Sequence, residues 1–319
     1  MTVARAGRPL TQPAPAAPVV TGSSARGRRL RETLGNILAQ RSAQVGLVML
    51  ALLLFTALFA DVIAPYSPTD QLNGPGEPGR RAPSCIHVLG CPEDQMETYL
   101  GTDGNSRDIY SRTIHGTRYS LPIGFVTVTF AILVGATIGA IAGFTGGGTD
   151  NVLMRVMDVL LAFPALILAI AIVTVLGPNT YNAVAAIVIV SIPVYARITR
   201  SSVLTTREFD YVTASRALGE SEAGILGRRV VPNSITPLIV AGTLGIATAI
   251  LEVAALSFLG LGAQEPLPEW GAMIGRDFNA IFTTPLLVLA PGIALTVTVL
   301  AFNLFGDGLR DALDPRLNR

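Results

Sequence analysis

The stretch at residues 208–232 reads EFDYVTASRALGESEAGILGRRVVP and lies between two apolar segments, residues 183–198 and 235–258. The stretch is polar and Arg-rich, and its helix start and stop signals predict two short helices. Long apolar segments are typical of membrane-spanning helices, and a hairpin between two spans needs far fewer residues than these. The sequence therefore indicates an all-α integral membrane protein that holds a helical docking surface at one membrane face.

The composition agrees with this class and excludes several others. Half of the 319 residues are hydrophobic, 14% are charged, and the formal net charge of +1 gives no reason to expect nucleic-acid binding. All 23 basic residues are arginine, so the chain lacks the lysine of a P-loop. Two histidines and two cysteines are too few for a convincing metal cluster. We expect no metal, cofactor or catalytic residues, and any P-loop ATP hydrolysis must belong to another chain.

Apolar stretches and the segments between them define the expected organisation. The first 44 residues are rich in Ala, Pro, Gly and Arg and are predicted to form a disordered tail and lead-in. We expect a first helix at residues 45–64, an external loop at 65–116, a core of five spans at 117–307 and a C-terminal segment at 308–319. The six predicted spans are residues 45–64, 121–144, 153–176, 183–198, 235–258 and 285–305.

The arginine distribution predicts the orientation of these spans. An even number of spans places both termini on one side, and that side carries 17 arginines against six on the other. Positive charge favours the cytoplasmic side. The termini and the segment at 197–234 are therefore predicted to be cytoplasmic, and the 65–116 loop external.

Local signals describe the polar stretch in more detail. Thr205 and Glu208 fit a capping box, Gly219 fits a helix C-terminus, and Ser221 fits the cap of a second helix that ends before Pro232. Ala214, with the small residues that follow it, keeps the surface low enough for another chain to approach. An amphipathic hairpin lying on lipid headgroups accounts equally well for this pattern.

A family resemblance decides between these interpretations. The stretch resembles the EAA loop of ABC importer permeases, with Thr213-Ala214-Ser215 at the E-A-A positions, Gly219 as the glycine and Val231-Pro232 at the end. Thr213, Ser215 and Arg229 depart from the consensus. The longer pattern is similar to the C-type permease subunit of dipeptide and oligopeptide importers. Segments elsewhere agree in order, namely Leu100-Gly101-Thr102-Asp103 with Arg107-Asp108, Gly116 to Leu121, Phe163-Pro164, Leu256 to Gly262, Trp270-Gly271 and Leu313-Asp314-Pro315.

The resemblance implies a type I ABC importer permease fold in a bacterial or archaeal plasma membrane. Its implied partners are a homologous second permease, cytoplasmic ABC ATPases and an extracytoplasmic substrate-binding protein. The implied substrate is a di- or oligopeptide, with nickel, glutathione or another small solute as the alternative. The residues implied to couple to the ATPase are Glu208, Asp210, Tyr211, Ala214, Ser215, Ala217, Leu218 and Gly219.

Charged residues and prolines within the spans are further candidates. Glu252 is the best pathway candidate, because ionisable groups in spans are costly and often functional, although a structural role at a helix interface accounts for it as well. Asp158 follows Arg155 at the spacing of an ion pair. Pro164, Pro193 and Pro291 predict bends or packing irregularities in three spans. Gly135 and Gly139 have the spacing for close helix packing.

Cys85 and Cys91 are the only cysteines and lie in the predicted external loop. An oxidising compartment permits a disulfide between them, although two cysteines are also few enough to be incidental. Two other function classes compete with transport. An intramembrane enzyme lacks support because no HExxH or GxSxG motif is present. A membrane sensor or scaffold that uses the hairpin to bind a partner stays open.

Overall fold

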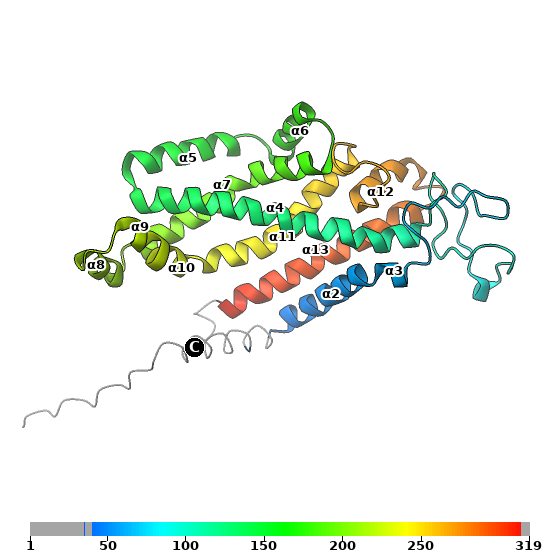
Figure 1. Ribbon diagram of the computed structural model, residues 1–319, viewed down its shortest axis with the longest axis horizontal. Helices are drawn as coiled ribbons and strands as arrows, with labels where there is room; N and C mark the ends of the chain where they lie inside the picture. The colour runs from blue at the N-terminus through cyan, green and yellow to red at the C-terminus, as the bar shows by residue number, and fades with distance from the viewer. Residues whose placement is uncertain (1–34, 36–39, 314–319) are drawn as a thin grey trace, which may run out of the picture.

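The computed structural model describes residue 35 and residues 40–313. Five helices within this part are long and apolar enough to cross a membrane, or six spans if the bent pair α5–α6 counts as one. Figure 1 shows them as an elongated bundle with the hairpin at 207–235 at its left end and the segment at 64–108 at its right end. We call these the hairpin end and the loop end. The spanning helices are α2 (Arg41–Leu58), α4 (Ile109–Thr145), the pair α5 (Gly147–Leu161) and α6 (Ala165–Leu176), α7 (Thr180–Thr206), α11 (Thr236–Phe258) and α13 (Leu286–Leu313).

Three glycines allow α4 and α7 to pack closely. Gly135, Gly139 and Gly143 recur at every fourth position of α4, and each faces the backbone of α7. A Cβ on Gly139 would lie 2.1 Å from the carbonyl oxygen of Ala196. The predicted packing role of Gly135 and Gly139 is therefore confirmed, and Gly143 extends it by one more turn.

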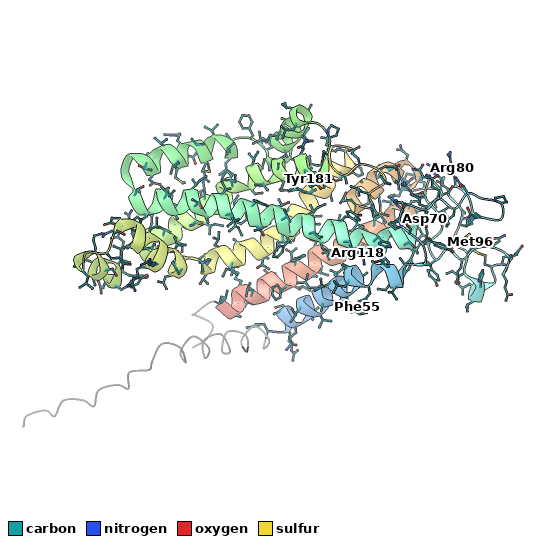
Figure 2. All side chains as sticks on the ribbon, in the orientation of Figure 1. Phe55, Asp70, Arg80, Met96, Arg118 and Tyr181 are labelled. Carbon is teal, nitrogen blue, oxygen red and sulfur yellow. A yellow bond between two sulfur atoms is a disulfide. The ribbon has the colours of Figure 1, made fainter. Side chains whose placement is uncertain are left out.

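The first span lies at the edge of the bundle. α2 and the short α3 (Ala60–Ile63) run beside α13 and the loop-end part of α4 (Figure 1). Arg118 of α4, labelled in Figure 2, donates hydrogen bonds to the carbonyl oxygen of Leu58 at 3.0 Å and to the carboxylate of Asp61 at 2.8 Å. Gly46 allows α2 to approach the backbone of α13. These contacts fix the first spanning helix against the core.

The third predicted span is divided. α5 and α6 meet at an angle of 88° across a break of a few residues that ends at Pro164. Pro164 precedes the first residue of α6, where its missing N–H costs no helical hydrogen bond. The predicted interruption at Pro164 is thus confirmed as a sharp break, whereas Pro193 and Pro291 lie inside the continuous helices α7 and α13.

Several boundaries differ from the predicted ones. α4 begins at Ile109, so the last part of the predicted 65–116 loop is helical, and α13 runs to Leu313. Asp108 caps α4 by accepting a hydrogen bond from the N–H of Ser111 at 2.7 Å, which sets the early start. Residues 41–44 belong to α2, while the rest of the predicted tail, apart from Gly35 and Gln40, and residues 314–319 lie outside the described part.

The loop end is closed by short elements between the spans. They are η1 (His87–Leu89), α12 (Trp270–Asp277) and η3 (Phe278–Ala280). The Trp270 side chain is fully buried, and its indole N–H donates to the carbonyl oxygen of Thr113 at 3.0 Å. Gly116 leaves room for this ring, because a Cβ there would lie 2.3 Å from the indole nitrogen. α12 is therefore locked against the start of α4.

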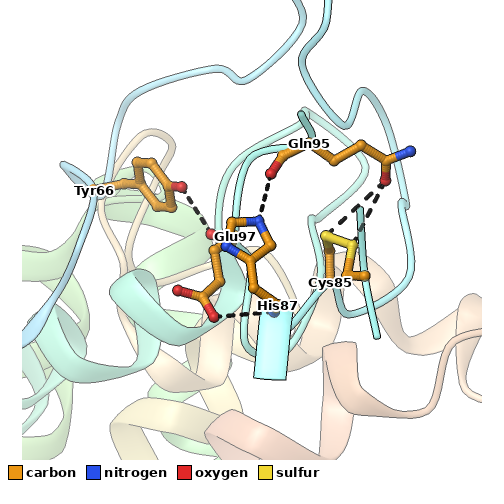
Figure 3. The surroundings of a disulfide bond; sticks show 6 residues. Tyr66, Cys85, His87, Gln95 and Glu97 are labelled. Carbon is orange, nitrogen blue, oxygen red and sulfur yellow. Dashed lines mark hydrogen bonds between the residues drawn. A yellow bond between two sulfur atoms is a disulfide. The ribbon is translucent and has the colours of Figure 1, made fainter. Parts of the chain in front are cut away.

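Cys85 and Cys91 are joined by a disulfide in the segment at 64–108 (Figure 3). The backbone N–H of Cys85 and the carbonyl oxygen of Thr98 pair at 2.9 Å, and His87 hydrogen-bonds the carbonyl oxygen of Gln95 at 2.8 Å. The Tyr66 hydroxyl donates to the carbonyl oxygen of Glu97 at 2.7 Å and ties the part around the disulfide, residues 85–98, to the rest of the segment.

The disulfide predicts a simple labelling result. Because the sequence has no third cysteine, a maleimide should modify no thiol in the unreduced protein and two thiols after reduction. Intact-mass measurement checks this. Two maleimide additions without any reductant would show that the bridge does not form.

Candidate functional site

The polar stretch forms a compact hairpin that begins where α7 ends at Thr206. It contains α8 (Asp210–Ala217), α9 (Glu222–Ile225), the π-helical turn η2 (Leu226–Val230) and α10 (Val231–Ser234). Figure 1 shows these elements gathered at the hairpin end, beyond the ends of α4 and α7. Val212, Ile225 and Val230 are fully buried and cluster with Val203 of α7. An apolar anchor thus holds the hairpin against the span.

Hydrogen bonds add a rigid connection to the bundle. Arg207 donates to the carbonyl oxygen of Gly143 at 2.7 Å and so satisfies one of the free carbonyls at the end of α4. The Ser202 hydroxyl donates to the carbonyl oxygen of Ser234 at 2.9 Å, and the Ser234 hydroxyl bonds to that of Thr206 at 3.0 Å. These bonds tie the hairpin to α4 and α7.

The outer side of the hairpin carries most of the predicted coupling residues. Ala214, Ala217 and Gly219 are exposed, and the Leu218 side chain is 87% exposed. Gly219 adopts φ of +81°, a conformation that suits the end of a helix at glycine. Glu208, Asp210 and Tyr211 are also exposed, whereas Ser215 is half-buried. α8 thus presents a low surface of small side chains with one protruding leucine.

Ion pairs brace the turn between α8 and α9. Arg216 donates to Glu222 at 2.7 Å, and Arg229 donates to Glu220 at 3.2 Å. The hydrogen bond and positive charge from Arg216 lower the pKa of Glu222. Both glutamates therefore help to set the angle at which α8 is presented.

Two local predictions in this stretch are wrong. Thr205 does not begin a capping box, because α7 continues to Thr206 and the Thr205 hydroxyl bonds back to the carbonyl oxygen of Ser201 at 3.2 Å. α8 begins at Asp210 without a side-chain cap. The second helical part does not stop before Pro232, since this proline sits in the first turn of α10, where it is tolerated. The Ser221 cap is confirmed by its bond from the N–H of Gly224 at 3.2 Å.

Glu252 lies on a cavity of about 330 Å³ in the middle of the bundle. The cavity is lined by residues of the α5–α6 bend, α7 and α11, which include Ser191, Tyr195 and Thr248. Glu252 is half-buried. No ion-pair partner faces it among the described residues, so its carboxyl group is directed at the cavity and not at a structural cation.

Asp158 is paired differently from the sequence prediction. Its carboxylate accepts a hydrogen bond from Arg197 of α7 at 2.6 Å, and not from Arg155. Nearby, Asp150 accepts two hydrogen bonds from Arg200, at 2.5 and 2.6 Å. α5 packs alongside α7, so cross-helix pairs replace the pair within α5. The sequence shows which residues are charged, but the partner of each one depends on how the helices pack.

A buried charge cluster at the loop end was not predicted. Asp103 is 2% exposed and lies 2.9 Å from Arg107, 3.0 Å from Arg276 and 3.5 Å from Arg112. Glu265 joins it through Arg107 at 3.0 Å. Burial alone would raise the pKa of Glu265, but hydrogen bonds from Arg276 and Arg107 hold the pKa below its usual value. The cluster ties the segment before α4 to the segment before α13.

No group of metal-ligating side chains is present in residues 40–313. The candidate site therefore consists of the exposed hairpin surface, the cavity that contains Glu252 and the buried charge cluster at the loop end.

Comparison with known proteins identifies the family. Residues 135–319 match the model for binding-protein-dependent transport system inner membrane components, and residues 29–75 match the N-terminal TM domain of oligopeptide transport permease C. The chain belongs to this family of inner-membrane transport components. This permease is accordingly a multi-pass membrane subunit, and its expected family and fold class are confirmed.

Curated relatives match this permease over most of its length. It is 40% identical to the dipeptide transport system permease protein DppC of Alkalihalophilus pseudofirmus, with 97% of each chain covered. It is 43% identical to the di/tripeptide permease DppC of Pseudomonas aeruginosa, with 90% of this chain and 92% of the relative covered. The glutathione permease GsiD of Pectobacterium atrosepticum is 38% identical, with 94% and 95% covered.

A solved structure agrees on the fold. An inward-facing form of the MetNI methionine ABC transporter aligns with a TM-score of 0.54 at 19% identity, covering 65% of this permease and 98% of that chain. The shared part is the type I ABC importer permease fold.

Proposed function

We propose that this permease is the membrane subunit of an ATP-driven importer for di- or oligopeptides. The observation that carries the proposal is the near full-length similarity to dipeptide permeases, which includes both the accessory first span and the core. The subunit itself performs no catalysis. ATP is hydrolysed on partner chains, in keeping with the absence of lysine from the sequence.

The hairpin serves as the coupling element in this proposal. Its exposed α8 surface, with Ala214, Ala217 and Leu218, fits a groove on a cytoplasmic ABC ATPase. Buried Val212 and the bond from Arg207 to Gly143 carry the movement of the ATPase into the spans. ATP binding would draw two such hairpins together and open the cavity around Glu252 to the other side of the membrane.

The arginine count supports an orientation with the hairpin end and both termini in the cytoplasm of a bacterial or archaeal cell. The loop end would then face a substrate-binding protein outside, where an oxidising compartment suits the disulfide. A homologous second permease would complete the pathway.

Reconstitution tests the function. Proteoliposomes should contain this permease together with the second permease, the ATPases and the binding protein encoded by neighbouring genes. They should take up a radiolabelled dipeptide only with ATP, and the binding protein should stimulate ATP hydrolysis. The control is the same complex with an ATPase that cannot hydrolyse ATP. Intact complexes that hydrolyse ATP but never accumulate the dipeptide would overturn the peptide assignment.

Glutathione is the second candidate substrate, because the Pectobacterium atrosepticum relative transports it by name and is 38% identical. Competition separates the two: excess unlabelled dipeptide should block uptake, and excess glutathione should not. If no ATPase co-purifies with the chain and the hairpin captures a different protein, the sensor or scaffold interpretation is favoured instead.

A further inference from the structure

We propose that the groove between α5 and α7 is a water-filled part of the translocation pathway that binds the carboxylate of the substrate through Arg155. The proposal rests on the peptide-import function above and assigns it a second contact site. The groove has a volume of about 680 Å³ and is lined by Asp150, Asn151, Met154, Arg155, Asp158, Arg197 and Arg200.

α5 has two exposed stripes with opposite character. Asn151, Arg155 and Asp158 recur at helical spacing and line the groove. The second stripe consists of Val152, Val156 and Val159, which are 65, 52 and 57% exposed. One face of the same helix is therefore suited to water and the neighbouring face to lipid or to an apolar partner.

The depth of the charges shows that the polar stripe cannot face lipid. Arg197 precedes the end of α7 at Thr206 by nine residues, which is about 14 Å along the helix. α7 is 27 residues long, so its ~40 Å length matches a bilayer with its headgroup layers, which are only ~5–7 Å thick on each side. With α7 spanning this whole thickness, Arg197 and its partner Asp158 lie below the headgroups, deeper than the cytoplasmic edge that the sequence predicts for residue 197. Both are about half exposed, with side-chain exposures of 52% and 47%. Charges at this depth pair with one another and face the bundle interior or a water-filled cavity, and this half-exposed pair opens onto the groove.

The charges in the groove leave one cation unpaired. Both oxygens of Asp150 are held by Arg200, and Asp158 is held by Arg197. Arg155 is exposed and has no ion-pair partner in the part of the chain that the structure describes. A guanidinium matches a carboxylate in shape and can bind it through two hydrogen bonds.

The groove and the Glu252 cavity are lined by neighbouring parts of α5 and α7. Leu160 and Leu161 of the cavity follow Asp158 on α5, and Val194 and Tyr195 precede Arg197 on α7. A peptide at neutral pH carries an ammonium group and a carboxylate. The acidic cavity and the basic groove form a complementary pair for these two ends, with the carboxylate nearer to the hairpin end.

Thiol labelling of the assembled complex tests whether the groove holds water. The Asn151→Cys and Val152→Cys variants place single reactive thiols at the same depth on the two stripes of α5, because both native cysteines are in the disulfide. A water-soluble methanethiosulfonate should modify Cys at position 151 at least tenfold faster than Cys at position 152. Equal rates, or no labelling at 151, would overturn the proposal.

The charge of the reagent tests Arg155. An anionic methanethiosulfonate should react faster at position 151 than a cationic one, and adding Arg155→Gln should reduce this ratio by roughly threefold to tenfold, the effect of one charge at short range in a partly hydrated groove. The matched control is Arg310→Gln, an exposed arginine near the end of α13. A ratio that is unchanged by Arg155→Gln contradicts the assignment.

Ligand protection tests the carboxylate. Millimolar dialanine should slow labelling at position 151 in complexes without the binding protein, whereas dialanine amide should not, and Arg155→Gln should abolish the difference. Equal protection by the acid and the amide would overturn carboxylate binding. ATP-dependent uptake by the wild-type complex is measured separately, so a wrong transport function and a wrong groove assignment give different results.

Discussion

Replacing Ala217 with arginine is expected to reduce ATP-coupled uptake at least tenfold while the permease stays folded in the membrane. Ala217 is exposed at the end of α8, so a larger side chain there can extend away from the hairpin. The neighbouring Leu218, 87% exposed, is an apolar side chain that only a partner can cover. A long cationic side chain at position 217, beside Leu218, would prevent a close-fitting groove of the partner from closing over α8.

Two measurements separate loss of coupling from loss of folding. The Ala217→Arg variant should purify from the membrane with wild-type yield and melting temperature, because the substitution lies outside the buried cluster around Val212. Its complex should lose the associated ATPase, or retain it without stimulation by the binding protein. Ala217→Ser, which preserves the low surface, should transport normally. Wild-type uptake by the Ala217→Arg complex would contradict the assignment of α8 as the coupling helix.

The sequence was sufficient to predict the spans because burial in lipid depends on composition. Each predicted apolar stretch coincides with a helix, with α2 followed by the short α3, or with the bent pair, although α7 extends to Thr206 beyond the predicted end at residue 198. The extension is stabilised where Arg207 binds the carbonyl oxygen of Gly143, 64 residues earlier. A contact of this kind is not visible in a local pattern, and for the same reason the capping box at Thr205 was predicted wrongly.

The partners of charged residues were the least predictable part of the site. Asp158 has Arg155 at a suitable spacing on its own helix, yet it binds Arg197, 39 residues away. Asp103 binds Arg276, which is 173 residues away. Helix packing brings these groups together, and the sequence gives only their chemical type. Only the structure distinguishes Arg155 as an arginine without an ion-pair partner among the described residues, because it shows that Asp158 binds Arg197 instead.

Replacing Gly139 with leucine should prevent the permease from folding, and replacing it with alanine should destabilise the fold. A Cβ at this position would lie 2.1 Å from the carbonyl oxygen of Ala196, and neither atom belongs to a flexible side chain. α4 and α7 must then separate along their whole contact, which exposes the apolar residues between them. Overpacking commonly costs about 1–3 kcal/mol, and a leucine, which also has to displace the α7 backbone, should exceed that range.

A graded series makes this test specific to the α4–α7 contact. Gly139→Ala should lower the melting temperature in detergent more than Gly135→Ala or Gly143→Ala, whose nearest contacts would be 2.7 and 2.8 Å. Gly139→Leu should yield no monodisperse protein. The control is Gly292→Ala on α13, where a Cβ meets open space. Alanine gains about 1 kcal/mol over glycine inside a helix, so this variant should be as stable as the wild type or more stable. A Gly139→Ala protein that melts at the wild-type temperature would show that α4 and α7 can part without loss, and the close glycine contact would then not be what holds the core together.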